Sequence, residues 1–275
     1  MDQFNPLNAI RPSILATDLD GTLIPLDDHP VNQADLTTLA KLLKEHAMGL
    51  IFVTGRPYPS VMQVMQSANL PRPEWILCDV GTSIYQRDKE GNYQALVAYQ
   101  NHLDTIAGDV SRQAVVKALH GQGGIQLQSA DNQRAHKISY QCDAAIIDTV
   151  ITAISHQLSQ QLPSWHALAS IDPFDGRGLI DILPAGASKA HGLLWLARHA
   201  NIDPSGIIFS GDSGNDLAAL TAGFRAIVVG NAASSVADSV EQQLGARNLS
   251  HRLYLAKNHA TSGVLEGLQR FLKNG

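Results

Sequence analysis

Short apolar runs that end abruptly in polar residues recur near both ends of the chain. They lack the polar alternation of a half-exposed strand, so they predict strands that are covered on both faces. The clearest runs are 14–16, 50–53, 75–77, 207–209 and 226–229. Stretches with apolar residues every three to four positions lie between several of them, as expected of covering helices. The pattern predicts an α/β fold with a doubly wound, parallel, Rossmann-like sheet.

Helical spacing is clearest in the segment 31–47, which predicts a helix that covers the sheet. A second helix is expected to start near residue 59. Further helices are predicted at 187–200, 215–222 and 258–272. Together these helices would complete the layers on both faces of the sheet.

The middle of the chain has a different pattern. Its strands alternate more visibly between apolar and polar residues, as in the segment 136–140, and it is rich in Gln, His and Ser. We therefore expect a separate α+β domain inserted into the first. The predicted core domain comprises residues 1–85 and 185–275, and the inserted domain comprises residues 86–184.

Composition narrows the class of partner. The 275-residue chain is 44% apolar, which is enough to fill a core, and it carries a formal net charge of −5. No basic surface is expected for nucleic acid or for an anionic membrane, so a small-molecule ligand fits better. The two cysteines, Cys78 and Cys142, are too few for a disulfide framework. Because no apolar run is long enough to span a bilayer, we expect a soluble cytoplasmic protein.

Polar motifs follow three of the predicted strands. Residues 18–22 (Asp-Leu-Asp-Gly-Thr) follow the first, 54–56 (Thr-Gly-Arg) the second, and 211–216 (Gly-Asp-Ser-Gly-Asn-Asp) the fourth. Ligands of open α/β sheets bind at the carboxyl edge of the strands, so these segments should converge. Each motif alone has an ordinary structural explanation as a turn, a loop or a helix cap. Their combination is what points to a catalytic site.

Four carboxylates would meet at that edge, those of Asp18, Asp20, Asp212 and Asp216. Two unit charges about 4 Å apart repel by about 4 kcal/mol at an effective dielectric constant of about 20, and a cation relieves this repulsion. The available ligands are oxygens, without Cys or His, which favours Mg²⁺ over zinc. We expect Asp18 and Asp212 to bind the metal directly and Asp216 to lie nearby or to act through water. Gly21 comes too early after Asp18 for a calcium-binding loop.

Asp18 and Asp20 divide the predicted chemistry. With an ordinary pKa of about 3.9, Asp18 is ionised at neutral pH and can attack phosphorus to form an aspartyl phosphate. Asp20 can protonate the leaving alkoxide and then act as a base. The pKa of Asp20 must be raised for this role, because a carboxyl with a pKa of about 3.9 is protonated in only about one molecule in a thousand at pH 7.

Phosphate is expected to bind beside these carboxylates. Thr54 offers a hydroxyl, and the backbone amides of Gly55 and Arg56 stand at a strand-to-helix turn, where amides can hold phosphate oxygens. Lys189 lies in the first turn of its predicted helix, where the helix dipole disfavours a cation unless an anion is present. Lys189 is therefore predicted to contact phosphate, and Asn215 is a further candidate contact. Such donors would stabilise a transferring phosphoryl group.

In order and spacing, the motifs resemble those of the haloacid dehalogenase superfamily. Residues 18–22 are similar to its first motif, Thr54 to its second, Lys189 to its third and residues 211–216 to its fourth. The insertion between the second and third motifs is placed as in the subgroup that carries a large cap of the second type (C2B-like). The resemblance therefore implies that the inserted domain is a substrate-covering cap.

The resemblance also implies roles for the acidic residues. Asp18 would be the nucleophile, Asp20 the acid and base, and Mg²⁺ would be held by Asp18, the backbone carbonyl of Asp20, and Asp212.

Within that subgroup the chain looks most like the sucrose-phosphate phosphatases. The supporting segments are 52–56, 79–85, 137–140, 181–184 and 211–216. One departure is Lys189-Ala190-His191, where the family usually has Lys-Gly.

The leading hypothesis is a phosphatase for a sugar phosphate, with sucrose 6-phosphate as the first candidate. Another phosphorylated disaccharide or small glycoside, such as mannosylfructose phosphate, is the alternative. Lys137 and Tyr140 are candidate sugar contacts, followed by His136, Asp175 and Arg177. A sugar-phosphate synthase upstream in the same pathway is a candidate partner.

Two other classes of protein remain open. Phospho-accepting signalling domains also combine clustered Asp residues, a Thr and a Lys on a doubly wound sheet. They need neither an acid two residues after the nucleophile nor an insertion of this size. A catalytically weak sugar-phosphate binding protein ranks last, because all the catalytic positions are filled.

Overall fold

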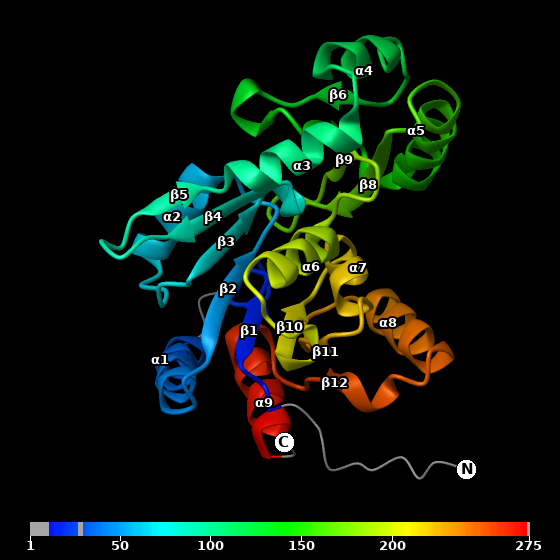
Figure 1. The fold of residues 1–275 in the computed structure, drawn as a ribbon. Coiled ribbons are helices and arrows are strands. Elements are labelled where there is room, and N and C mark those ends of the chain that lie inside the picture. Colours follow the sequence, from blue (N-terminus) through cyan, green and yellow to red (C-terminus); the bar gives the residue numbers. More distant parts are fainter. Residues whose placement is uncertain (1–10, 27–29, 274–275) are drawn as a thin grey trace, which may run out of the picture.

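The computed structural model describes residues 11–26 and 30–273, which form two units, each built on its own sheet (Figure 1). The larger sheet has the strand order β12-β11-β10-β1-β2-β3-β4-β5. Its strands are β1 (Ile14–Thr17), β2 (Gly49–Val53), β3 (Trp75–Cys78), β4 (Ser83–Arg87), β5 (Tyr93–Ala95), β10 (Ile207–Gly211), β11 (Arg225–Val228) and β12 (Leu253–Leu255). β4 pairs antiparallel with β3 and β5, and all other pairings are parallel. The predicted doubly wound α/β fold is confirmed, and all five predicted strands lie in this sheet.

Strand β1 lies at the point where the strand order reverses. The chain leaves β1 toward β2 and β3 on one side and later returns to β10 on the other side. Thr17, the last residue of β1, pairs with Phe52 of β2 and with Ser210 of β10. Connections diverge from such a point, so a crevice opens at the carboxyl ends of these strands.

Successive residues of the central strands face opposite layers of helices. Leu50 and Phe52 of β2 belong to one apolar cluster, and Ile51 and Val53 belong to the other. This is why these runs lack polar alternation. The helices α1 (Pro30–Glu45), α2 (Tyr58–Ser67) and α9 (Ala260–Lys273) contribute to the first cluster. The helices α3 (Val97–Ala107), α6 (Lys189–His199), α7 (Leu217–Leu220) and α8 (Ser234–Ala246) contribute to the second.

The helix predicted at 215–222 is shorter than expected. A 3₁₀ turn, Gly214–Asp216, precedes α7, and Thr221 ends it. None of the helices in the described ranges is long and apolar enough to cross a membrane.

The smaller unit is an antiparallel sheet with the order β6-β7-β9-β8, covered on one face by two helices. Its elements are β6 (Gln126–Leu127), β7 (Ile138–Cys142), β8 (Trp165–Ile171), β9 (Gly178–Pro184), α4 (Arg112–Ala118) and α5 (Ile147–Gln161). Figure 1 shows this unit above the larger sheet, beyond the upper ends of β1 and β2. We call the larger unit the core and the smaller unit the cap.

The sequence placed the first boundary between the two units too early. β4 extends to Arg87 and β5 pairs with it, so residues 86–95 continue the core sheet rather than opening the cap. Tyr99 and Leu103 of α3 also pack in a core cluster, whereas Ala107 at the end of α3 packs in the cap. The predicted return at residue 185 directly follows β9.

Candidate active site

The carboxyl ends of β1, β2 and β10 form the floor of a pocket of about 240 Å³ that the cap covers. The core lines it with Asp18, Asp20, Thr54, Gly55, Arg56, Pro57, Val80, Asp212, Ser213 and Asn215. The cap lines it with Gln128, Asn132, Lys137, Ser170, Ile171, Asp172, Pro173, Phe174, Leu179 and Asp181. The three strand-end motifs therefore meet in one place. A larger cavity of about 420 Å³, beside Asn32 and Asn258, contains none of them.

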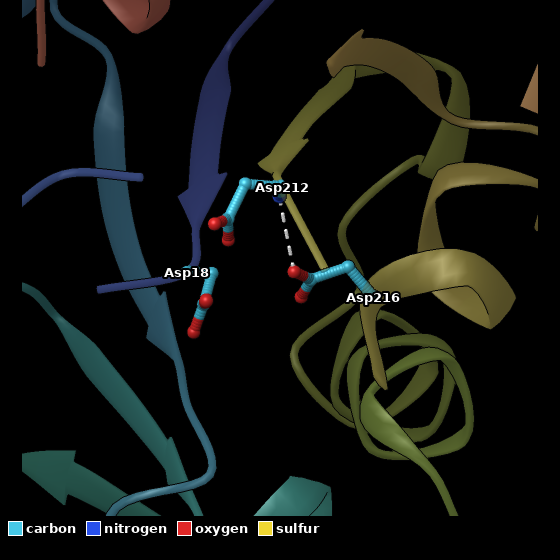
Figure 2. Close-up of side chains that lie close together, drawn as sticks. All are labelled: Asp18, Asp212 and Asp216. Carbon is cyan, nitrogen blue, oxygen red and sulfur yellow. Dashed lines mark hydrogen bonds between the residues drawn. The ribbon is translucent and has the colours of Figure 1, made fainter. Parts of the chain in front are cut away.

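Three carboxylates converge on this floor, as Figure 2 shows. One oxygen each of Asp18, Asp212 and Asp216 lies within 4.8 Å of the others. Thr22 donates a hydrogen bond of 3.0 Å to Asp212, which fixes this carboxylate against the loop that carries Asp18. Gly21 has a φ of +74°, and a Cβ atom there would overlap Asp212, so glycine is what lets the two loops meet.

Lys189 joins two of the carboxylates. It is the first residue of α6 and is fully buried. Its Nζ lies 2.9 Å from Asp18 Oδ1 and 2.7 Å from Asp216 Oδ1. The other oxygen of Asp216 accepts hydrogen bonds from the backbone amides of Asp212 and Ser213. With both oxygens engaged, Asp216 holds Lys189 and the 211–216 loop in place.

The charges on the floor are not balanced by the protein alone. Burial, followed by repulsion from Asp216, raises the pKa of Asp18 well above its ordinary value, although Lys189 opposes the shift. Burial and Asp216 likewise raise the pKa of Asp212 to about 7. Two buried carboxylates, those of Asp18 and Asp216, and the half-buried carboxylate of Asp212 thus lie around one ammonium group. A hard cation bound to their oxygens would relieve the excess negative charge. The donor set therefore fits a divalent ion such as Mg²⁺.

Asp20 is paired with Arg56 rather than with the carboxylate cluster. Arg56 Nε donates to Asp20 Oδ2 and Nη2 donates to Oδ1, each at 2.6 Å, and Nη1 donates to Ser60 at 2.8 Å. This two-point contact fixes the orientation of the Asp20 carboxylate. The Arg56 backbone amide, a predicted phosphate contact, donates to the Thr54 hydroxyl at 3.2 Å.

Lys137 is the predicted sugar contact that reaches the pocket from the cap. Its Nζ lies 3.4 Å from Asp181 Oδ1. Asp181 also accepts a hydrogen bond of 2.5 Å from Ser139, the residue opposite it in the β7–β9 pairing. Asp181 was not predicted as a site residue, because the sequence around it does not show that its strand pairs with β7. The segment 181–184 supported the family resemblance, but without a role for its acid.

Tyr140 was wrongly predicted as a sugar contact. Side chains alternate along a strand, so Tyr140 shares a face of β7 with Ile138 and Cys142, opposite to Lys137. It packs in the apolar cluster of the cap and is only 5% exposed. The alternation within 136–140 was the signal that could have corrected this prediction.

Three secondary candidates also lie away from the pocket walls. His136 is buried, and its Nε2 lies 2.8 Å from Asp104 Oδ1 of α3. Asp175 and Arg177 pair with each other at 3.0 Å and border a different surface hollow. None of the three lines the pocket. The cap lines it instead with residues that include Gln128, Asn132, Asp172 and Phe174.

Known proteins resemble this chain over most of its length. The family model for sucrose-6F-phosphate phosphohydrolase matches residues 11–272. A Nitrosococcus oceani protein described as a HAD-like hydrolase is 29% identical over 266 residues, which cover 94% of this chain and 71% of the relative. Mannosylfructose-phosphate phosphatase of Agrobacterium fabrum is 25% identical over 265 residues, which cover 94% of this chain and 96% of that enzyme.

A solved structure extends the likeness to the whole fold. The sucrose-phosphatase of Synechocystis, crystallised with sucrose and phosphate, aligns with a TM-score of 0.79 and 26% identity. The alignment covers 95% of this chain and 98% of that one. The family match over nearly the full length, together with the convergent strand-end motifs, shows that this chain belongs to the sucrose-6F-phosphate phosphohydrolase family of haloacid dehalogenase-like hydrolases and is a phosphoric monoester hydrolase.

Proposed function

We propose that this chain is a Mg²⁺-dependent phosphatase that hydrolyses a sugar phosphate, with sucrose 6-phosphate as its first candidate substrate. The observation that carries the proposal is the carboxylate cluster of Asp18 and Asp212 at the ends of β1 and β10, with Asp20 beside it. The cap closes this floor with polar walls suited to hydroxyl groups. Family membership and the likeness to a sucrose-phosphatase support the choice of substrate.

The metal would be held by the Asp18 and Asp212 carboxylates and by the backbone carbonyl of Asp20. When bound, Mg²⁺ would neutralise charge on the transferring phosphoryl group and keep the Asp18 carboxylate ionised. Thr22 orients Asp212 for this task through its hydrogen bond. Asp216 would act indirectly, since its oxygens already bind Lys189 and backbone amides.

Asp18 would supply the nucleophile. An oxygen of its carboxylate forms a bond to phosphorus while the bond between phosphorus and the sugar oxygen breaks, which leaves an aspartyl phosphate and a sugar alkoxide. Lys189, 2.9 Å from Asp18 Oδ1, would hold that carboxylate in line. The Thr54 hydroxyl and Asn215 border the space for the phosphoryl oxygens.

Asp20 would carry the proton in both half-reactions. It donates a proton to the sugar oxygen as that bond breaks, and then takes a proton from the water that attacks the aspartyl phosphate. In the structure both of its oxygens bind Arg56. Donation therefore requires Asp20 to be protonated and to release at least one of the two guanidinium contacts.

A different phosphorylated disaccharide is the second candidate within the same chemistry. Mannosylfructose phosphate belongs here because the chain resembles the Agrobacterium phosphatase over nearly its whole length. No feature of the pocket favours a phospho-accepting signalling domain, since the cap walls and Asp20 would then have no role.

The pathway and the cellular setting are part of the proposal. An enzyme that makes the phosphorylated sugar, such as a sugar-phosphate synthase, would supply the substrate. A cytoplasmic setting is consistent with Cys78 and Cys142, which are both unpaired and buried.

A substrate screen tests the proposal. The purified chain should release phosphate from one or a few phosphorylated sugars when Mg²⁺ is present, and chelation of the metal should stop the reaction. The Asp18→Asn variant should bind Mg²⁺ more weakly, keep the fold by circular dichroism, and release no phosphate. Release from none of the phosphorylated sugars, or equal release by Asp18→Asn, would refute the assignment.

A further inference from the structure

The pocket has three chemically different sides. Its floor carries the carboxylates of the core motifs, and its polar wall carries Gln128, Asn132, Lys137 and Asp181. The remaining side, which we call the apolar roof, consists of Ile171, Pro173, Phe174 and Leu179. All four roof residues come from the β8–β9 hairpin or its connecting loop. A ligand that satisfies all three sides must combine an anionic group, hydroxyls and an apolar face.

Phe174 is the most solvent-exposed large apolar side chain in the described part of the chain, at 68%. Ile171 of the same roof is 48% exposed. Single exposed apolar residues are common on proteins and need no function. Here Phe174 and Ile171 differ from an isolated exposed residue, because both line the same side of one pocket, opposite its charged floor.

The loop that carries Phe174 is held by its own hydrogen bonds. Asp172 Oδ1 accepts from the backbone amide of Phe174 at 2.8 Å, and the Asp172 amide donates to the carbonyl of Arg177 at 2.8 Å. The amide of Gly176, which has a φ of +73°, donates to the Asp172 carbonyl. The loop thus presents the ring of Phe174 at a defined place without burying it.

The ring of Phe174 also contacts the core next to the candidate acid. The guanidinium carbon of Arg56 lies 5.7 Å from the ring centroid, within range of a cation–π contact. Arg56 in turn binds both oxygens of Asp20. One side of the ring is therefore engaged beside the reaction centre, and the large exposed fraction shows that most of the ring is free to meet a ligand.

We propose that Phe174 is a specificity-determining residue whose open ring packs against the C–H face of a sugar ring in the substrate, while the polar wall binds that sugar's hydroxyls. A sugar ring is a ligand with an apolar face and a hydroxyl rim, which matches the two cap sides of the pocket. This inference rests on the proposed sugar-phosphate phosphatase function. It adds a selection rule, namely that affinity for the sugar part depends on the aromatic ring at position 174.

Product inhibition separates the sugar part of the site from the phosphate part. We would measure kcat and KM for sucrose 6-phosphate, and the inhibition constants of sucrose and of inorganic phosphate. Phe174→Ala should raise KM and the inhibition constant of sucrose by about tenfold each, which corresponds to about 1.4 kcal/mol. The inhibition constant of inorganic phosphate should stay within about twofold of the wild type, because phosphate binds the core floor.

Two further variants provide the controls. Phe174→Tyr keeps an aromatic ring and should retain the wild-type KM. Ile146→Ala removes another exposed apolar side chain of the cap, 38% exposed and outside the pocket, and should change none of the constants. An unchanged KM in Phe174→Ala, or an equal rise in the phosphate constant, would overturn the inference. Failure of the wild type itself to hydrolyse any sugar phosphate would instead overturn the proposed function and the inference with it.

Discussion

Replacing Arg134 by alanine should destabilise the protein, because Arg134 of the cap faces a carboxylate buried in the core. Asp79, directly after β3, is only 1% exposed. Neither of its oxygens has a hydrogen-bond partner of good geometry in the described ranges, although the Ser83 hydroxyl helps to lower its pKa. Arg134 Nε lies 3.6 Å from Asp79 Oδ1. The positive charge that offsets the buried Asp79 carboxylate therefore comes largely from the cap, through Arg134 and the nearby Lys137.

The size of the effect follows from the distance and from exposure. Opposite unit charges 3.6 Å apart attract by about 5 kcal/mol at an effective dielectric constant of about 20, which is an upper bound. The Arg134 side chain is 30% exposed, so water screens part of this attraction, and Lys137 remains as a second nearby cation. We therefore expect Arg134→Ala to lower the free energy of unfolding by about 1–3 kcal/mol.

The effect should depend on pH with a definite sign. Burial raises the pKa of Asp79, and Lys137 and Arg134 oppose this shift. A carboxyl whose pKa is higher in the folded state makes folding less favourable as pH rises through the interval between its unfolded and folded values. Removal of Arg134 raises the folded pKa of Asp79 further. The fall in the free energy of unfolding caused by Arg134→Ala should therefore be largest at about pH 8. It should be smaller at about pH 4, where Asp79 is protonated more fully in the variant than in the wild type.

Urea unfolding of a double-mutant cycle is the assay. Arg134→Ala, Asp79→Asn and the double variant are compared with the wild type at both pH values, and the two single changes should be non-additive at the higher pH. Arg177→Ala is the matched control, since this cap arginine is 56% exposed and pairs with Asp175 of its own loop. It should cost less than about 0.5 kcal/mol. An equal loss for Arg134→Ala at both pH values, or a loss no larger than that of the control, would refute the reasoning.

Three further predictions concern the candidate site and its support. Asp20→Asn should lower kcat by about 10²–10⁴ while circular dichroism stays unchanged, and a kcat within a few-fold of wild type would remove Asp20 from acid–base catalysis. Gly81→Ala should lower the free energy of unfolding, measured in urea, by about 1–3 kcal/mol, because Gly81 has a φ of +85° and a Cβ atom there would overlap the Ser188 carbonyl. An unchanged midpoint of urea unfolding would contradict this. Lys137→Met should raise KM for the sugar phosphate by about tenfold, whereas Tyr140→Phe should leave KM unchanged, because Lys137 lines the pocket and Tyr140 packs in the apolar cluster of the cap. A raised KM in Tyr140→Phe together with an unchanged KM in Lys137→Met would instead identify Tyr140 as the sugar contact.

The core fold could be predicted because its strands are continuous apolar runs. Burial on both faces removes polar positions from β1, β2 and β10, and this pattern survives in the sequence without any knowledge of neighbours. The boundary at residue 85 failed for the opposite reason. β5 is Tyr93–Ala95, a three-residue edge strand with two exposed positions, so it has no apolar run to reveal it.

The residues of the pocket floor could be predicted because they directly follow the carboxyl ends of neighbouring parallel strands. Asp18, Thr54 and Asp212 follow consecutive or adjacent parallel strands, so the topology alone brings them together. The residues that the cap contributes to the pocket could not be predicted in the same way, because their positions depend on how strands distant in the sequence pair with each other. Asp181 reaches the pocket only because it pairs across β7 and β9 with Ser139, and no local pattern contains that pairing.

The role of Phe174 was also out of reach of the sequence. Its position over Arg56 depends on how the cap loop folds back onto the core, which is a contact between segments more than a hundred residues apart.

The most direct measurement is capture of the phosphoryl group on Asp18. The enzyme is mixed with an accepted sugar phosphate and Mg²⁺, quenched in acid during turnover, digested, and examined by mass spectrometry. We predict one added phosphoryl group on the peptide that contains Asp18, its loss on treatment with hydroxylamine, and its absence from Asp18→Asn. Steady release of phosphate by the wild type with the label on another residue, or continued turnover by Asp18→Asn, would contradict the account.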